Sequence, residues 1–136
     1  MSNQEAILEP ALLRRLVSRL EKEQHLAAAY LLGSAVRGAL RPDSDLDIAL
    51  LPVRGRMIAA EDRFSLAADL EDLAGRPVDV GVLSTANLVY AKEAVAHGRV
   101  IFERDRTARA RFAMLVFSMY ASLQESRREV LHAYAA

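Results

Sequence analysis

Some features that define whole classes of protein are missing from this chain of 136 residues. It has no cysteine, which excludes disulfides and thiolate metal sites. No uninterrupted apolar run approaches the roughly 18 residues that would span a bilayer. The N-terminus also lacks the basic segment and apolar core of a secretory signal. We therefore expect a soluble cytoplasmic protein that does not bind membranes.

Neither sign of charge is in excess. Lys and Arg total 18, Asp and Glu total 18, and the formal net charge is zero. Strong attraction to nucleic acid is therefore not expected. The chain is long enough to bury a core but short for a catalytic module plus a substrate domain. We predict a single domain over residues 1–136, with a C-terminal helical extension over about 105–136.

Hydrophobic periodicity predicts the order of helices and strands. Helices are expected over residues 10–24, 57–74, 85–96 and about 105–136, the last with room for a break near Ala121 or Ser122. Strands are expected over 27–32, 45–51, 78–83 and 99–103, with one helical turn at 35–40 and a tight turn at 41–44. This order predicts an α+β fold (an α/β sandwich) in which helices pack on a small mixed β-sheet.

Local signals refine the helices. Pro10 suits the first turn of a helix, and Gly75 is placed to end the second helix in a left-handed conformation. Ser84 or Thr85 is available as N-cap of the third. The apolar side of the second helix is expected to contain Met57, Ile58, Phe64, Leu66, Leu70 and Leu73.

The stretch from Gly33 to Asp47 contains most of the candidate functional residues. Gly33 and Ser34 follow an apolar run, and after ten further residues Asp45-Leu46-Asp47 opens another. Glycine lets the backbone turn sharply and approach a ligand, and a serine hydroxyl and N–H can face phosphate oxygens. In a strand, residues two apart share a face, so Asp45 and Asp47 would present paired carboxylates, which favour a hard cation such as Mg2+ or Mn2+.

Each half of this pattern is common when taken alone. An Asp-x-Asp that follows a Pro-Asp-Ser turn is more often a solvated loop. Together, and each beside an apolar run of strand length, the two halves predict a phosphate site next to a metal site. Arg37 could add a forked phosphate contact, and Ser44 joins the nucleotide-binding candidates.

A third acid, Asp79, lies within the predicted strand PVDVGVL. Its neighbours Val78, Val80 and Val82 alternate on the opposite face. Burying an unpaired charge in an apolar strand costs several kcal/mol, and a bound metal would remove that cost. We therefore expect Asp79 to join the metal site.

These motifs, GSAVRG, SDLDIALL and PVDVGVL, resemble those of the nucleotidyltransferase superfamily that includes DNA polymerase beta. The resemblance is closest to its minimal nucleotidyltransferase (MNT) branch, and it covers the chain from the first helix to about Glu103. One departure is Val36, where MNT proteins commonly have alanine. The change affects loop packing and leaves every polar group in place.

The resemblance implies a fold and a reaction. The fold would be that of the polymerase-beta-like nucleotidyltransferases. Asp45 and Asp47 would hold two Mg2+ ions, Asp79 would bind the catalytic one and help to orient or deprotonate the acceptor hydroxyl, and Gly33 and Ser34 would hold the outer phosphates of ATP. The acceptor would attack the α-phosphate and pyrophosphate would leave.

Three functions are compatible with that chemistry. MNT proteins are typically antitoxins that transfer AMP to a tyrosine of a co-encoded HEPN-type toxin ribonuclease, and we favour this function. The second is a small-molecule nucleotidyltransferase of the aminoglycoside-modifying kind, although little chain remains after Glu103 for an acceptor domain. The third is an antitoxin that acts by docking alone, which would have no need of three acids.

The C-terminal helix contains a pattern of its own. Arg127, His132 and Tyr134 reproduce the spacing of the HEPN ribonuclease motif and its nearby tyrosine. A HEPN active site requires a whole helical bundle, so we interpret the match as coincidence. The alternative is a self-modified or decoy tyrosine.

Overall fold

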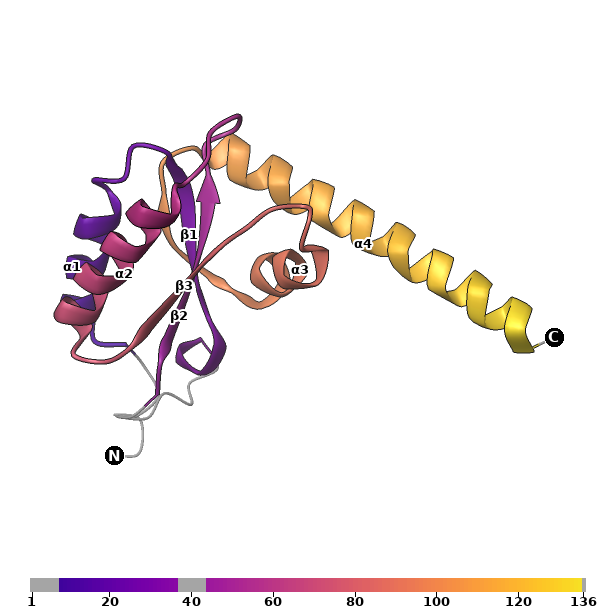
Figure 1. Cartoon of the computed structure of the whole chain (residues 1–136), viewed down its shortest axis with the longest axis horizontal. Coiled ribbons are helices and arrows are strands. Elements are labelled where there is room, and N and C mark those ends of the chain that lie inside the picture. Colours follow the sequence, from indigo (N-terminus) through magenta and orange to yellow (C-terminus); the bar gives the residue numbers. More distant parts are fainter. Residues whose placement is uncertain (1–7, 37–43, 136) are drawn as a thin grey trace.

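The computed structural model describes residues 8–36 and 44–135. Its helices are α1 (Pro10–Leu20), α2 (Ala60–Ala74), α3 (Leu88–His97) and α4 (Arg106–Ala135), and its strands are β1 (Leu26–Leu32), β2 (Leu46–Pro52), β3 (Val78–Val82) and β4 (Arg99–Glu103). A short 3-10 helix, η2 (Gly33–Ala35), follows β1. The α+β order predicted from the sequence is confirmed (Figure 1).

The four strands form one mixed sheet in the order β3-β2-β1-β4. Strand β1 is antiparallel to both of its neighbours, β2 and β4. Strand β2 runs parallel to β3, and helix α2 provides the crossover connection that a parallel pair requires. The sheet therefore brings two segments that are distant in sequence, the start of β2 and the start of β3, into register.

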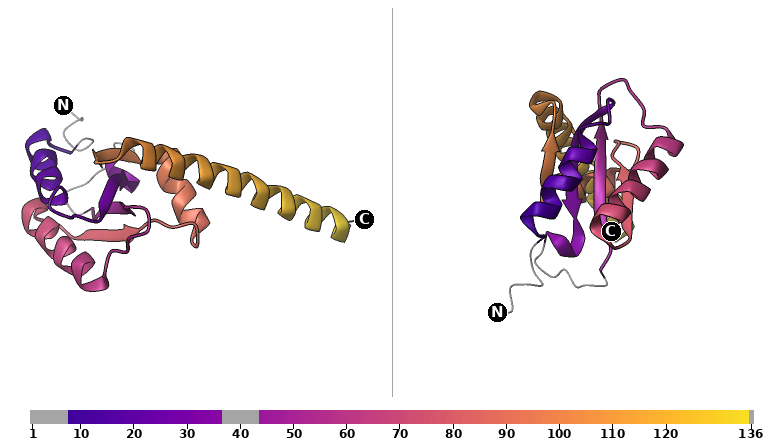
Figure 2. Two further views of the ribbon diagram at one scale, coloured as in Figure 1. Left: turned by 90° about the horizontal axis from the view of Figure 1, so that it is seen from above. Right: turned by 90° about the vertical axis from the view of Figure 1, so that its left-hand side faces the viewer.

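Helices cover both faces of the sheet. Figure 1 and Figure 2 show α1 and α2 on one face, and α3 with the beginning of α4 on the other. Every residue of β1 is buried, which explains its uninterrupted apolar sequence. The core is divided accordingly: Leu16, Leu20, Ile48, Leu66 and Leu70 lie with α1 and α2, and Tyr30, Ala49, Ala91, Ala94 and Val116 lie with α3 and α4.

Two predicted boundaries of the first helices are corrected. Helix α1 ends at Leu20, not at Gln24, because the backbone continues in turns. Helix α2 begins at Ala60, not at Met57, and Met57 is 85% exposed. Phe64, which was expected on the buried side, is 71% exposed. It precedes the buried Leu66 by two positions, which places it about 200° around the helix from Leu66.

The third helix also begins later than predicted. Asn87 is its N-cap residue, and neither Ser84 nor Thr85 caps it. The Ser84 hydroxyl instead accepts a hydrogen bond from the Ala86 N–H at 3.1 Å. This short-range bond stabilises a turn ahead of the helix, which is the usual competition between serine and helical hydrogen bonding.

Helix α4 is continuous over 30 residues, so the break near Ala121 or Ser122 is not present. Its first part packs on α3 and β1, where Val116 is fully buried. From Glu125 to Ala135 every residue is exposed, and Figure 2 shows this end projecting away from the sheet. No helix in the described part of the chain is long and apolar enough to cross a membrane.

Gly75 ends α2 in the left-handed conformation predicted for it, with φ of 68°. We expect Gly75→Ala to lower the free energy of unfolding by about 1 kcal/mol and the melting temperature by about 3–5 °C, because alanine is strained at this φ. Gly75→Asn should cost less, since asparagine tolerates the left-handed region. Thermal denaturation of both variants checks this, and equal losses would contradict the backbone explanation.

Candidate active site

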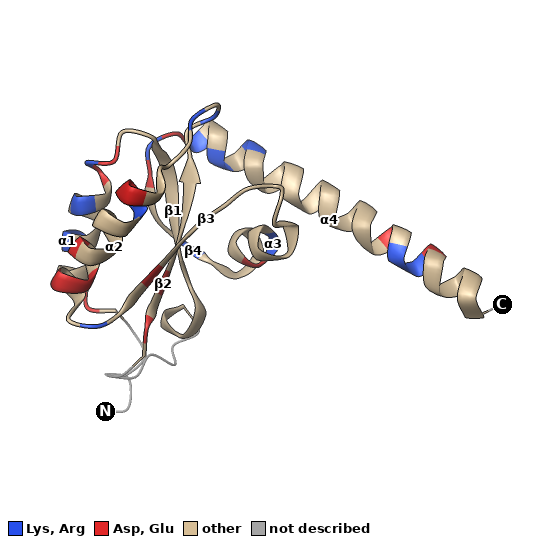
Figure 3. Cartoon of the chain, viewed as in Figure 1, with Lys and Arg blue, Asp and Glu red and all other residues tan. Residues whose placement is uncertain are grey.

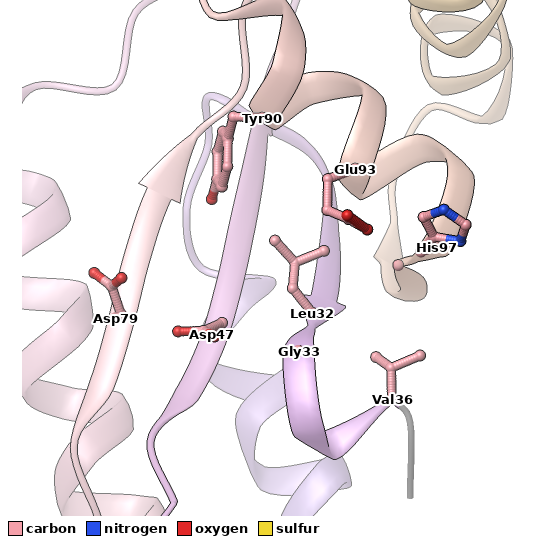
Figure 4. A pocket seen from close by; sticks show the side chains of 9 residues that line it. Leu32, Gly33, Val36, Asp47, Asp79, Tyr90, Glu93 and His97 are labelled. Atoms are coloured by element: carbon pink, nitrogen blue, oxygen red, sulfur yellow. The ribbon is translucent and has the colours of Figure 1, made fainter. Parts of the chain in front are cut away.

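A cavity of about 680 Å3 lies between the sheet and α3. Its volume falls within the range of small-molecule sites, roughly 300–1,000 Å3. Its lining residues come from the end of β1, the starts of β2 and β3, and α3: Leu32, Gly33, Val36, Asp47, Asp79, Tyr90, Glu93, His97 and Gly98. Figure 4 shows their side chains from close by. Three of the residues predicted from the sequence, Gly33, Asp47 and Asp79, therefore meet in one cavity.

The parallel pairing of β2 with β3 sets Asp47 directly opposite Asp79. Neighbouring strands lie about 4.8 Å apart, and side chains at paired positions point to the same face. In Figure 4 the two carboxylates project into the same space. Two acids in this arrangement repel each other, and a divalent cation between their oxygens would relieve that repulsion. The oxygen donors present thus fit Mg2+.

Asp79 is exposed, so the burial cost predicted for its charge is wrong. It lies near the start of an edge strand, where one side of the strand has no neighbour in the sheet. The physical reason for a cation here is therefore not burial of one charge. It is the proximity of a second acid, Asp47, on the adjacent strand.

Gly33 turns the chain at the end of β1 with φ of 71°, a conformation that favours glycine. A Cβ atom at this position would lie 2.8 Å from the Oδ2 atom of Asp47. The bare backbone of Gly33 therefore allows the carboxylate of Asp47 to lie against the turn. The predicted phosphate turn and the predicted metal ligand are in direct contact.

Three other predicted site residues, Ser34, Ser44 and Asp45, are not among the lining residues. Ser34 is half-buried within η2. Asp45 is exposed and precedes β2, and the carbonyl oxygen of Ser44 accepts a hydrogen bond from Arg76 Nη1 at 3.2 Å. Within residues 8–36 and 44–135, no group of three or more acidic or histidine side chains could hold a metal ion. Arg37 lies outside the described residues.

The sequence analysis missed the wall of the cavity that α3 contributes. Tyr90, Glu93 and His97 are spaced by three and four residues, so they share one side of the helix. His97 was interpreted only as a helix-end residue. Helical periodicity could have grouped the three residues, but nothing in the sequence indicates that this side of α3 faces the acids.

Tyr90 is the residue of α3 whose side chain points towards both acids (Figure 4). Burial raises the pKa of its hydroxyl, and the negative charges of Asp79 and Asp47 raise it further. The hydroxyl lies so close to Gly81 that a Cβ atom at that position would require the ring to shift. Gly81 is two residues beyond Asp79 on β3 and therefore faces the same side of the sheet.

Comparison with known proteins identifies the family of the chain. The family model described as "Polymerase beta, Nucleotidyltransferase" matches residues 14–107, so the chain belongs to that family and is a nucleotidyltransferase. A curated relative, the protein adenylyltransferase MntA of Shewanella oneidensis, is 30% identical over 106 residues, which are 78% of this chain and 74% of MntA.

Two solved structures extend the similarity. A toxin–antitoxin structure with AMP-PNP contains a chain that is 26% identical, with a TM-score of 0.73, over 95% of this chain and 100% of its own length. A mutant toxin–antitoxin structure that includes MntA contains one that is 25% identical, with a TM-score of 0.74, at the same coverage. The polymerase-beta-like fold expected from the motifs is confirmed.

The contact between Gly33 and Asp47 generates a prediction. We expect Gly33→Ala to weaken ATP binding at least tenfold and adenosine binding much less, because the added Cβ displaces the carboxylate and fills space beside the phosphates. Gly55→Ala is the matched control: Gly55 has φ of 79°, and a Cβ there meets nothing within 4 Å. Calorimetric titration of both ligands checks this. Equal losses for ATP and adenosine would make Gly33 a residue of the fold alone.

Proposed function

We propose that this chain is an antitoxin that uses ATP and Mg2+ to transfer AMP to a tyrosine of a HEPN-type toxin ribonuclease in the cytoplasm. The observation that carries the proposal is the Asp47–Asp79 pair beside the Gly33 turn in a single cavity. The relative MntA is named a protein adenylyltransferase, and an ATP analogue accompanies the toxin–antitoxin relative. Both names support the same interpretation.

Each of the three aspartates has its own proposed role. Asp47 and Asp79 would hold Mg2+ between them, and Asp45, just before β2, is the candidate for completing the ligand set once ATP enters. When bound, the cations would neutralise the charge on the phosphate oxygens of ATP. The Asp79 carboxylate would orient the attacking hydroxyl and accept its proton.

The phosphate side of the cavity is at the Gly33 turn. Gly33 offers close backbone approach to the outer phosphates, and Ser34, the next residue, is the candidate for a hydroxyl contact. Ser44 and Arg37 remain candidates for further nucleotide contacts. Pyrophosphate would then leave on the Gly33 side of Asp47, and the acceptor hydroxyl would approach from the Asp79 side, as in-line displacement requires.

The acceptor that fits best is another protein. Helix α4, which follows β4, contributes none of the residues that line the cavity. Between Phe112 and Gln124 this helix has no charged residue, and Figure 3 shows the stretch as an uncharged band. It exposes large apolar side chains there and further along: Met114, Leu115, Phe117, Met119, Val130 and Leu131. A surface of this kind is suited to a protein partner.

Metal dependence is the first consequence. We expect ATP binding to weaken at least tenfold when Mg2+ is removed by a chelator, because the cation would offset the repulsion between the carboxylates and the triphosphate. Asp47→Asn should abolish AMP transfer without lowering the melting temperature by more than about 3 °C. The matched control is Asp62→Asn, an exposed acid of α2 on the opposite side of the sheet. Calorimetry with and without chelator measures this, and equal affinities would exclude the metal site.

Transfer to the partner is the second consequence. In cells that co-express the chain with a HEPN-type toxin encoded beside it, mass spectrometry should find one or more adenylyl groups on a toxin tyrosine. The toxin should remain unmodified with Asp47→Asn and modified with Asp62→Asn. An unmodified toxin that the Asp47→Asn chain nevertheless inhibits fully would establish inhibition by docking alone.

A further inference from the structure

Tyr90 places a tyrosine hydroxyl inside the cavity where a tyrosine acceptor is expected. We propose that Tyr90 is itself an acceptor, and that without a protein partner the chain transfers AMP from ATP to its own Tyr90. This inference rests on the proposed nucleotidyl transfer from ATP. It adds a modification site on the chain itself.

The position of the hydroxyl is fixed by packing. Helix α3 is held against the sheet by Ala91 and Ala94, both fully buried, so Tyr90 has little freedom to leave the cavity. Its ring lies over Gly81, where the missing Cβ leaves room for it. A larger residue at 81 would force the ring away from Asp79.

The side of approach is that of an acceptor. Figure 4 shows Tyr90 above the gap between Asp79 and Asp47, with Gly33 on the other side of Asp47. A nucleophile must attack the α-phosphorus opposite to the departing pyrophosphate. With the outer phosphates at Gly33, the Tyr90 hydroxyl lies on the attacking side, next to the acid that would take its proton.

The step balances without any further reagent. The Tyr90 Oη atom forms a bond to the α-phosphorus of ATP, and the bond from that phosphorus to the oxygen bridging the β-phosphate breaks. Pyrophosphate leaves with the electron pair. The hydroxyl proton passes to the Asp79 carboxylate and then to water, and the product is a phosphodiester between Tyr90 and AMP.

The other three tyrosines are poorly placed for this reaction. Tyr30 is 2% exposed in the core. Tyr120 lies on α4, where its hydroxyl accepts a hydrogen bond from Gln124 Nε2 at 2.7 Å. Tyr134 is 87% exposed, but it belongs to the C-terminal end of α4, which projects away from the sheet (Figure 1). Exposure alone would therefore favour Tyr134 as the acceptor, whereas the geometry of the cavity favours Tyr90.

Modification of Tyr90 would stop after one AMP group per chain. The attached AMP would remain in the cavity that binds ATP, so each chain would accept a single group and then bind ATP weakly. A chain that has met ATP without its partner would thus be inactivated. An acceptor from the partner would have to reach the α-phosphate before Tyr90 does.

The test uses the full chain purified without a partner and incubated with ATP and Mg2+. Peptide mass spectrometry should find AMP on Tyr90, approaching one group per chain, and on no other tyrosine. Tyr90→Phe should lose the modification, and Tyr134→Phe, the matched control, should keep it. The rate per chain should not change on tenfold dilution, because donor and acceptor belong to one molecule.

Several results would overturn the inference. One is AMP on Tyr134 but not on Tyr90, and another is a rate that falls in proportion to dilution. A third is an unmodified Tyr90 in a chain that binds ATP with Mg2+ and modifies the co-expressed toxin, which would leave the proposed function intact. If neither Tyr90 nor the toxin gains AMP, both proposals fail. Calorimetry with ATP and a melting curve establish whether Tyr90→Phe is folded and still binds nucleotide.

Discussion

The parallel pairing of β2 with β3 is the constraint on which the cavity depends. It places Asp47 opposite Asp79 on the same face, and a shift of one residue would turn one of the two carboxylates to the α1 and α2 side. The register is enforced by the buried face, where Leu46, Ile48 and Val80 pack beneath the helices. The apolar core thereby holds together two like charges that would separate if they were free to do so.

The two faces of the sheet are specialised by residue size. On the α3 face the strands carry small residues, such as Ala49 and Gly81, which let α3 approach closely. Close approach brings Tyr90 over the acids and closes one wall of the cavity. The small residues that shorten the distance between helix and sheet thus help to determine which side chains of α3 face the cavity.

Local chemistry explains which parts of this molecule were predictable from the sequence. Gly33, Asp47 and Asp79 were identified because glycine turns and acids beside apolar strands are uncommon combinations, and Gly75 because few other residues end a helix in its conformation. The roles of these residues in the reaction remain predictions. The features that the sequence did not reveal depend on contacts between elements that are distant in the sequence. The side of α3 that faces the acids follows from packing across the sheet, and the exposure of Asp79 follows from its position on an edge strand.

Packing within the chain does not explain the full length of helix α4. A helix in water gains most of its stability from an apolar face packed on other elements, and residues 125–135 have no such packing. This exposed end nevertheless contains Val130, Leu131 and Tyr134. Polar residues at these positions would lose no packing within the chain. The uncharged stretch before them likewise exposes large apolar side chains, among them Met114, Leu115 and Phe117. We infer that the remaining apolar surface is covered by the protein that supplies the acceptor.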